Sequence, residues 1–69
     1  MLTVTLNGQP RELPDGATVA DAVRAVGAPE DGRGVAAAID GEVVPRAQWT
    51  VRALIAEDRV EVLRAVQGG

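Results

Sequence analysis

The stretch TVADAVRAV at residues 18–26 decides the fold. Its apolar residues recur at i, i+3, i+4 and i+7, which places them on one stripe of an α-helix: Val19, Ala22, Val23 and Val26. Thr18 followed three residues later by Asp21 is a capping-box pattern, with the acid near the positive end of the helix. Gly27 is placed to end the helix. The stretch therefore predicts one amphipathic helix with a single apolar face to bury.

The residues before this helix predict a β-hairpin. Apolar and threonine residues alternate over residues 2–6, which is the pattern of a half-buried strand. Asn7-Gly8 follows, and this pair is a strong hairpin signal because both turn positions need positive φ. Residues 9–13 form the returning strand, and Pro10 within it indicates an edge position.

A second hairpin is predicted after the helix. Residues 35–39 contain three alanines, which favour a helix by propensity, but the short length between glycines favours a buried strand. Asp40-Gly41 then forms the turn to a strand that Pro45 ends. Residues 46–54 have no clean period and are interpreted as a helical turn and loop carrying Trp49. A lone tryptophan either covers the core or contacts a partner, and both interpretations stay open.

The last strand runs from Arg59 to about Ala65. Alternation places Val60 and Val62 on the inner face, and Glu61, Leu63 and Ala65 on the face away from the helix. The same parity points Arg64 inward, which requires either a bulge or a side chain that extends to water. The apolar residues Leu63 and Ala65 on the outer face are explained either by a docking role or by the ordinary scatter of apolar residues over a protein surface.

The element order is hairpin, helix, hairpin and final strand. One helix on one face of a mixed sheet of four to five strands is an α+β solution, and we expect the first and last strands to lie side by side at its centre. The 69 residues make one small domain, predicted over residues 1–65, followed by a flexible Gly-Gly tail over residues 66–69.

Composition excludes several classes of function. The chain has no cysteine, histidine, lysine or tyrosine, so we expect no metal site, no bound cofactor and no catalytic residues of its own. Adjacent acids at Glu30-Asp31 and Glu57-Asp58 are interpreted as solvated turn residues. A net charge of −3 and a single aromatic residue argue against nucleic-acid binding. No signal peptide or long apolar run is visible, so we expect a cytoplasmic protein that does not enter membranes.

The tail Val66-Gln67-Gly68-Gly69 is suited to chemistry performed by another protein. A carboxylate becomes electrophilic when it is joined to AMP, and a sulfur nucleophile that displaces the AMP leaves a thiocarboxylate. Glycine suits a narrow channel because its backbone can approach closely and adopt any φ. Extended, the four residues reach roughly 13 Å, enough to enter a partner's tunnel while the folded body docks outside.

The chain resembles the ThiS family, the sulfur carriers of thiamin biosynthesis with the β-grasp, ubiquitin-like fold. The resemblance runs over essentially the whole chain and rests on the order and spacing of several motifs: NG at 7–8, LPDG at 13–16, TVADAV at 18–23, IDGEVVPRAQW at 39–49, DRVEV at 58–62 and QGG at 67–69. Two positions depart from the family pattern. Asp40 stands where Asn is common and makes the same turn, whereas Glu57 stands where the family has Gly, at a cost of about 1 kcal/mol if φ is positive there.

The resemblance implies a carrier rather than an enzyme. Gly69 would be adenylated by a ThiF-type, E1-like enzyme that uses ATP and Mg²⁺, then converted to a thiocarboxylate with sulfur from a cysteine desulfurase or another donor. A ThiG-type thiazole synthase would take the sulfur to build the thiazole of thiamin. Gly68 carries over with Gly69, Val66 and Gln67 complete the threaded tail, and Leu63 and Ala65 fit a docking surface on the sheet.

Three alternatives stay open at this point. The first is another β-grasp sulfur carrier, such as the small subunit of molybdopterin synthase or a carrier for cysteine or a secondary metabolite. A ubiquitin-like modifier joined to target lysines through Gly69 belongs to a different class. The third is an interaction domain whose Gly-Gly has no chemical role.

Overall fold

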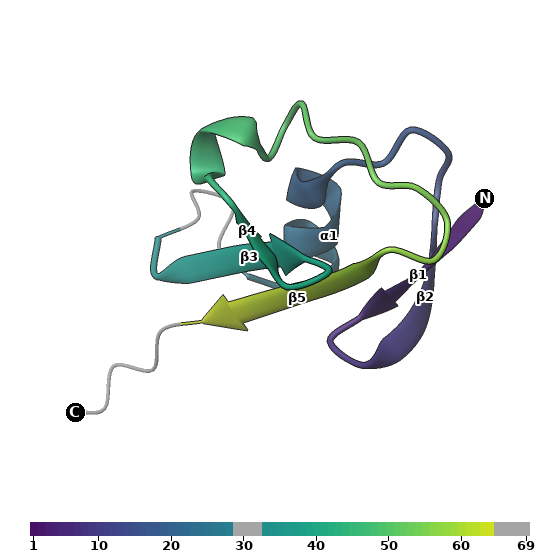
Figure 1. Cartoon of the computed structure of the whole chain (residues 1–69), viewed down its shortest axis with the longest axis horizontal. Coiled ribbons are helices and arrows are strands. Elements are labelled where there is room, and N and C mark those ends of the chain that lie inside the picture. The colour runs from purple at the N-terminus through teal and green to yellow at the C-terminus, as the bar shows by residue number, and fades with distance from the viewer. Residues whose placement is uncertain (29–32, 65–69) are drawn as a thin grey trace.

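The computed structural model describes residues 1–28 and 33–64, and these form one mixed sheet with one α-helix (Figure 1). The elements are, in chain order, β1 (Leu2–Leu6), β2 (Gln9–Leu13), α1 (Val19–Ala25), β3 (Val35–Ile39), β4 (Glu42–Val44), the 3₁₀ turn η1 (Arg46–Gln48) and β5 (Arg59–Arg64). The five strands lie in the order β2-β1-β5-β3-β4. The predicted α+β architecture is confirmed, and the sheet has five strands where four to five were expected.

The first and last strands lie side by side at the centre of the sheet, as predicted. β1 runs parallel to β5, with Leu6 opposite Val60, and β3 pairs antiparallel with the other edge of β5. Each hairpin adds one outer strand, β2 beside β1 and β4 beside β3. Pro10 lies in β2 at the edge of the sheet, where its missing N–H removes no ladder hydrogen bond.

Both hairpin turns have the backbone conformation that their sequences predict. Asn7 and Gly8 have φ of 50° and 81°, and Asp40 and Gly41 have φ of 50° and 83°. Two successive positive φ values twist the chain in the direction that suits paired strands, which explains the preference for Asn-Gly and Asp-Gly. The strand interpretation of residues 35–39 is confirmed with the second turn.

The helix α1 begins with the predicted cap. The backbone N–H of Thr18 donates to Oδ2 of Asp21 at 2.8 Å, and the Thr18 hydroxyl lies 3.2 Å from the same oxygen. The backbone hydrogen bond from Thr18 is the main reason that the pKa of Asp21 lies below its ordinary value, and Arg24 adds to the effect. Gly27, at a φ of 76°, ends the helix. Local sequence chemistry therefore determines both helix ends.

The core lies between α1 and the sheet. Val19 and Val23 of the helix are fully buried together with Val4 of β1 and Val60 of β5. Trp49 is only 4% exposed, and its Nε1 donates to the carbonyl of Val44 at 2.9 Å. The tryptophan therefore belongs to the core, which settles the alternative that the sequence left open.

The connection from Trp49 to β5 crosses the helix side of the molecule and returns to the sheet beside β1 (Figure 1). Glu57 sits in its final turn at a φ of 70°, and its N–H donates to the carbonyl of Thr3 at 2.8 Å. The interpretation of Asp58 as a solvated residue is wrong. Asp58 is buried, and its Oδ2 accepts a hydrogen bond from the N–H of Ile55 at 2.9 Å. Glu30-Asp31 lies outside the described residues.

Candidate partner interface

Strand β5 presents one face to the core and the other to solvent. Val60 and Val62 are buried, whereas Leu63 is 65% exposed on the opposite face. The register with β3 is continuous through the pair of Val35 and Arg64, so the bulge considered for Arg64 is absent. Arg64 is exposed instead, as expected of a side chain that extends to water at the strand end. The predicted outward position of Leu63 is confirmed.

Leu63 belongs to a small apolar surface that crosses three strands. Ala36 of β3 lies directly opposite Leu63, and Ala38 lies opposite Val43 of β4. Because alternate residues of a strand share a face, these four side chains lie on the side of the sheet away from α1. We call this set, Leu63, Ala36, Ala38 and Val43, the outer apolar patch. Val43 is its most exposed large residue at 72%.

Charged residues border the outer apolar patch. Arg59 and Glu61 lie on the same face of β5, and Glu61 is opposite Ala38. Within residues 1–28 and 33–64 the recorded ion pairs join the Met1 amino group to Asp15 and Arg24 to Asp21, so neither uses these two β5 charges. An apolar centre with charges at its rim is the usual composition of a protein-docking surface.

A hollow of about 380 Å³ lies where β5 ends. It is lined by Gly34, Val35, Ala36, Leu63 and Arg64, and it therefore adjoins the outer apolar patch. Ala65, predicted as the second docking residue, and the predicted tail Val66 to Gly69 lie outside the described residues, as does the boundary between domain and tail. The last described residue of β5 is Arg64, two positions before the predicted tail begins at Val66.

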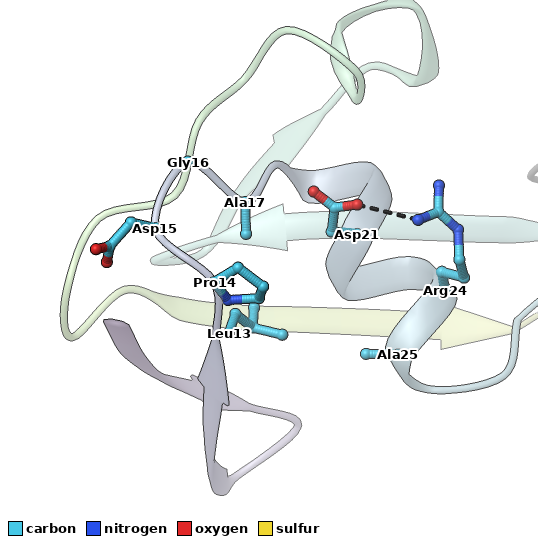
Figure 2. Close-up of a pocket in the computed structure, with 8 residues that line it drawn as sticks. All are labelled: Leu13, Pro14, Asp15, Gly16, Ala17, Asp21, Arg24 and Ala25. Atoms are coloured by element: carbon cyan, nitrogen blue, oxygen red, sulfur yellow. Dashed lines mark hydrogen bonds and ion pairs between the residues drawn. The ribbon is translucent and has the colours of Figure 1, made fainter. Parts of the chain in front are cut away.

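A second hollow, of about 400 Å³, lies between the β2–α1 loop and the helix (Figure 2). Its charged lining residues are Asp15, Asp21 and Arg24. Asp21 caps the helix and pairs with Arg24 at 3.1 Å, so these groups have structural roles. The amino group of Met1 forms an ion pair with Oδ1 of Asp15 at 3.2 Å. None of the predicted site residues lines this hollow.

Three features are absent from the part of the chain that the structure describes. Among residues 1–28 and 33–64, no three acid side chains are grouped so as to hold a metal ion. The same residues contain no buried side-chain N or O atom without a hydrogen-bond partner. None of their helices is long and apolar enough to cross a bilayer. The predicted site residue that the structure describes, Leu63, lies in the outer apolar patch.

Comparison with known proteins identifies the group to which this arrangement belongs. The family model of the ThiS family matches residues 4–69, which includes the helix, the strands β2 to β5 and β1 from Val4 onward. The chain belongs to the ThiS family. The resemblance to the sulfur carriers of thiamin biosynthesis is thereby confirmed at the level of the family. No curated protein sequence matches the chain.

A solved structure establishes the fold of this ThiS family chain. The crystal structure of the thiamine biosynthesis protein ThiS from Geobacter metallireducens has a TM-score of 0.77 and 24% sequence identity to it. The match covers 99% of this chain and 100% of the other. The predicted β-grasp fold is therefore confirmed.

The sequence did not predict Val43, Ala36 and Ala38 as part of the candidate interface. The strand Glu42–Val44 is too short to show alternation, and its two valines give no indication of which one is buried. The turn at Asp40-Gly41 could have predicted the face of Val43, because a two-residue hairpin fixes the register of its two strands.

Proposed function

We propose that this ThiS family chain carries sulfur as a thiocarboxylate on Gly69 and delivers it for thiazole formation in thiamin biosynthesis. The observation that supports the proposal is the outer apolar patch at the end of β5, the strand that leads into Val66-Gln67-Gly68-Gly69. A docking surface placed next to a narrow, side-chain-poor tail suits a protein that is held by its body and modified at its end. The chain then acts as a co-substrate of its partners, without catalytic residues of its own.

Two steps convert the Gly69 carboxylate. In the first, a carboxylate oxygen attacks the α-phosphorus of ATP, which forms the acyl-adenylate and releases pyrophosphate. In the second, a sulfur nucleophile attacks the activated carbonyl carbon, the C–O bond to AMP breaks, and AMP leaves with the electron pair. With sulfide as the nucleophile, the product after loss of a proton is –C(O)S⁻. With a persulfide as the nucleophile, the product is first an acyl disulfide; a second thiol then attacks the donor's sulfur, so that –C(O)S⁻ leaves and the thiol and the donor are joined as a disulfide. A ThiF-type, E1-like enzyme supplies the site, ATP and Mg²⁺, and a cysteine desulfurase or another donor supplies the sulfur.

The outer apolar patch and the tail have different roles in this proposal. Leu63 and Val43 are the large side chains whose burial favours docking, and Ala65 is proposed to extend the same surface. Gly68 and Gly69, preceded by Val66 and Gln67, enter the partner's channel, with a reach of roughly 13 Å when extended. A ThiG-type thiazole synthase would then accept the sulfur from the same tail. We place these steps in the cytoplasm, where ATP for the first step is abundant.

Intact-mass spectrometry of the full chain tests the proposal. The chain is incubated with the ThiF-type enzyme from the same genome, ATP, Mg²⁺ and sulfide, and we expect a mass gain equal to exchange of one oxygen for sulfur. Omission of ATP, or deletion of Gly69, should abolish the gain. No change under the complete conditions would contradict the proposal, and a covalent adduct with lysines of other proteins would support the modifier alternative instead.

The choice of acceptor needs a second measurement. The thiocarboxylate form is mixed separately with a ThiG-type thiazole synthase and with the large subunit of a molybdopterin synthase. We expect loss of the sulfur only with the thiazole synthase and its other substrates. Transfer only to the molybdopterin enzyme would retain the carrier chemistry and overturn the assignment to thiamin.

A further inference from the structure

Asn7 makes contacts that its role as a turn residue does not require. Its side-chain Oδ1 accepts a hydrogen bond from the N–H of Val62 at 2.8 Å, and its Nδ2 donates to the carbonyl of Val62 at 3.2 Å. Its backbone N–H also donates to the carbonyl of Val60 at 2.9 Å. One residue near the start of the chain therefore forms three hydrogen bonds to β5, across 55 positions of sequence in the case of Val62.

These contacts hold a part of β5 that β1 itself does not reach. β1 ends at Leu6, opposite Val60, so Val62 has no strand residue beside it on that edge. The carboxamide of Asn7 presents one acceptor and one donor, which is the same pair of groups that a backbone peptide would present. The side chain therefore extends the parallel ladder by one further residue, toward the end of β5.

The second hairpin turn provides a contrast at the opposite end of the strand. Asp40 has the same φ as Asn7, 50°, and its Oδ1 accepts a hydrogen bond from the N–H of Arg59 at 3.2 Å. Arg59 is the first residue of β5, whereas Val62 is next to Leu63 of the outer apolar patch. The two turn residues thus anchor the same strand, but only Asn7 does so beside the proposed docking surface and tail.

We propose that Asn7 is a positioning residue for the sulfur-carrier reactions, which fixes the end of β5 so that Leu63 and the following tail are presented together. This inference rests on the proposed function. On the β3 side the strand end is held by the pairing of Ala36 with Leu63 and of Val35 with Arg64. On the β1 side, among the described residues, the recorded side-chain bonds to Val62 come from Asn7. Without them, the strand end is held along one edge.

A strand end held along one edge opens more often, and each opening moves Leu63 away from its place opposite Ala36. A partner that binds both the outer apolar patch and the tail must then order this segment at each encounter. Misplacement of a reacting group by about 1 Å can cost as much as 10²-fold in rate, so partial loosening should cost roughly tenfold. The change should appear in kcat/KM for thiocarboxylate formation, since docking and chemistry both use the same segment.

Two substitutions of Asn7 separate the side-chain contacts from the turn. Asn7→Gly keeps the turn, because glycine adopts positive φ without strain, and it removes both bonds to Val62. Asn7→Asp also suits the turn and retains the acceptor for the Val62 N–H, but its carboxylate cannot donate to the Val62 carbonyl. The matched control is Asp40→Gly, which removes a side-chain bond from the equivalent turn position to the start of β5.

The experiment measures kcat/KM for thiocarboxylate formation with the ThiF-type enzyme, alongside amide hydrogen exchange of Val62 in the free carrier. We expect Asn7→Gly to lower kcat/KM about tenfold and to raise Val62 exchange about tenfold or more, with Asn7→Asp in between. Asp40→Gly should keep kcat/KM within about twofold of the original chain. Trp49 fluorescence confirms that each variant is folded.

The outcomes separate this inference from the proposed function. If the original chain gains no sulfur, the proposed function fails, whatever the variants do. If the original chain is converted and Asn7→Gly is converted equally well despite faster Val62 exchange, the positioning role is overturned. An equal loss in Asp40→Gly would also overturn it, because the effect would then follow any weakening of β5. If Asn7→Gly does not fold, the comparison of Asn7→Asp with Asp40→Gly decides.

Discussion

Glu57 has a backbone conformation that its side chain disfavours, and replacing it with glycine should stabilise the protein. Its φ is 70°, in the left-handed region where a Cβ atom approaches the neighbouring carbonyl. The side chain is exposed, and the turn is held by the backbone bond from the Glu57 N–H to Thr3 at 2.8 Å. Glu57→Gly would therefore relieve the strain and leave that hydrogen bond in place.

The expected magnitude is the difference between two effects. The left-handed conformation costs roughly 1–2 kcal/mol for a residue with a Cβ atom. Glycine adds conformational freedom to the unfolded chain, which offsets about 0.4–1 kcal/mol of the gain. The net increase in the free energy of unfolding should be about 1 kcal/mol, or a rise in Tm of roughly 7 °C for a domain of this size.

Urea unfolding followed by Trp49 fluorescence measures this change, because the buried indole becomes exposed when the core opens. Glu57→Ala is the matched control, since it removes the same carboxylate and retains the Cβ atom. It should leave the free energy of unfolding unchanged within about 0.5 kcal/mol. If the alanine variant gained as much as the glycine variant, the benefit would come from the lost charge, and the argument from backbone strain would be refuted.

Two further predictions concern the outer apolar patch and the helix cap. Val43→Asp should lower kcat/KM with the activating enzyme about tenfold, because it removes an apolar side chain that the partner would cover in the complex. Val51→Asp is the control, since Val51 is 74% exposed against 72% for Val43, and it should leave kcat/KM unchanged. Equal losses in the two variants would assign the effect to the added charge. Asp21→Ala should reduce the free energy of unfolding at neutral pH by about 0.5–1 kcal/mol, as measured by urea unfolding. Because the folded pKa of Asp21 is lowered, its contribution to the free energy of unfolding is present above the ordinary value of 3.8 and should be lost as the pH falls through the folded pKa. A difference in stability between Asp21→Ala and the original chain that stays constant from pH 7 to pH 2 would contradict the assignment.

Much of the fold could be predicted because short-range chemistry decides it. The helix begins and ends where Thr18, Asp21 and Gly27 indicate, and both hairpins turn at residues that tolerate positive φ. The central pairing of the first and last strands followed from placing one helix over one sheet. The outward position of Leu63 followed from alternation alone. For the helix ends, the turns and Leu63, the signal lies within a few residues of the feature.

The features that could not be predicted depend on contacts between distant segments. The hydrogen bonds from Asn7 to Val62 join residues 55 positions apart, and no local sequence pattern predicts them. Burial of Asp58 depends on the fold of the turn that brings the Ile55 N–H to its carboxylate. Trp49 could cover the core or face a partner until the carbonyl of Val44 was seen to accept its N–H. Val43 was missed because its short strand shows no alternation.

The most direct test of the central claim is fragmentation of the intact, enzyme-treated chain in the mass spectrometer. A gain of about 16 Da is ambiguous by itself, because oxidation of Met1 to its sulfoxide adds nearly the same mass. Fragments that contain Gly69 should carry the entire gain after treatment with the activating enzyme, ATP and sulfide, and fragments that contain Met1 should carry none. If the gain stays with Met1, or if no fragment containing Gly69 carries it, this chain does not bear sulfur at its carboxyl end.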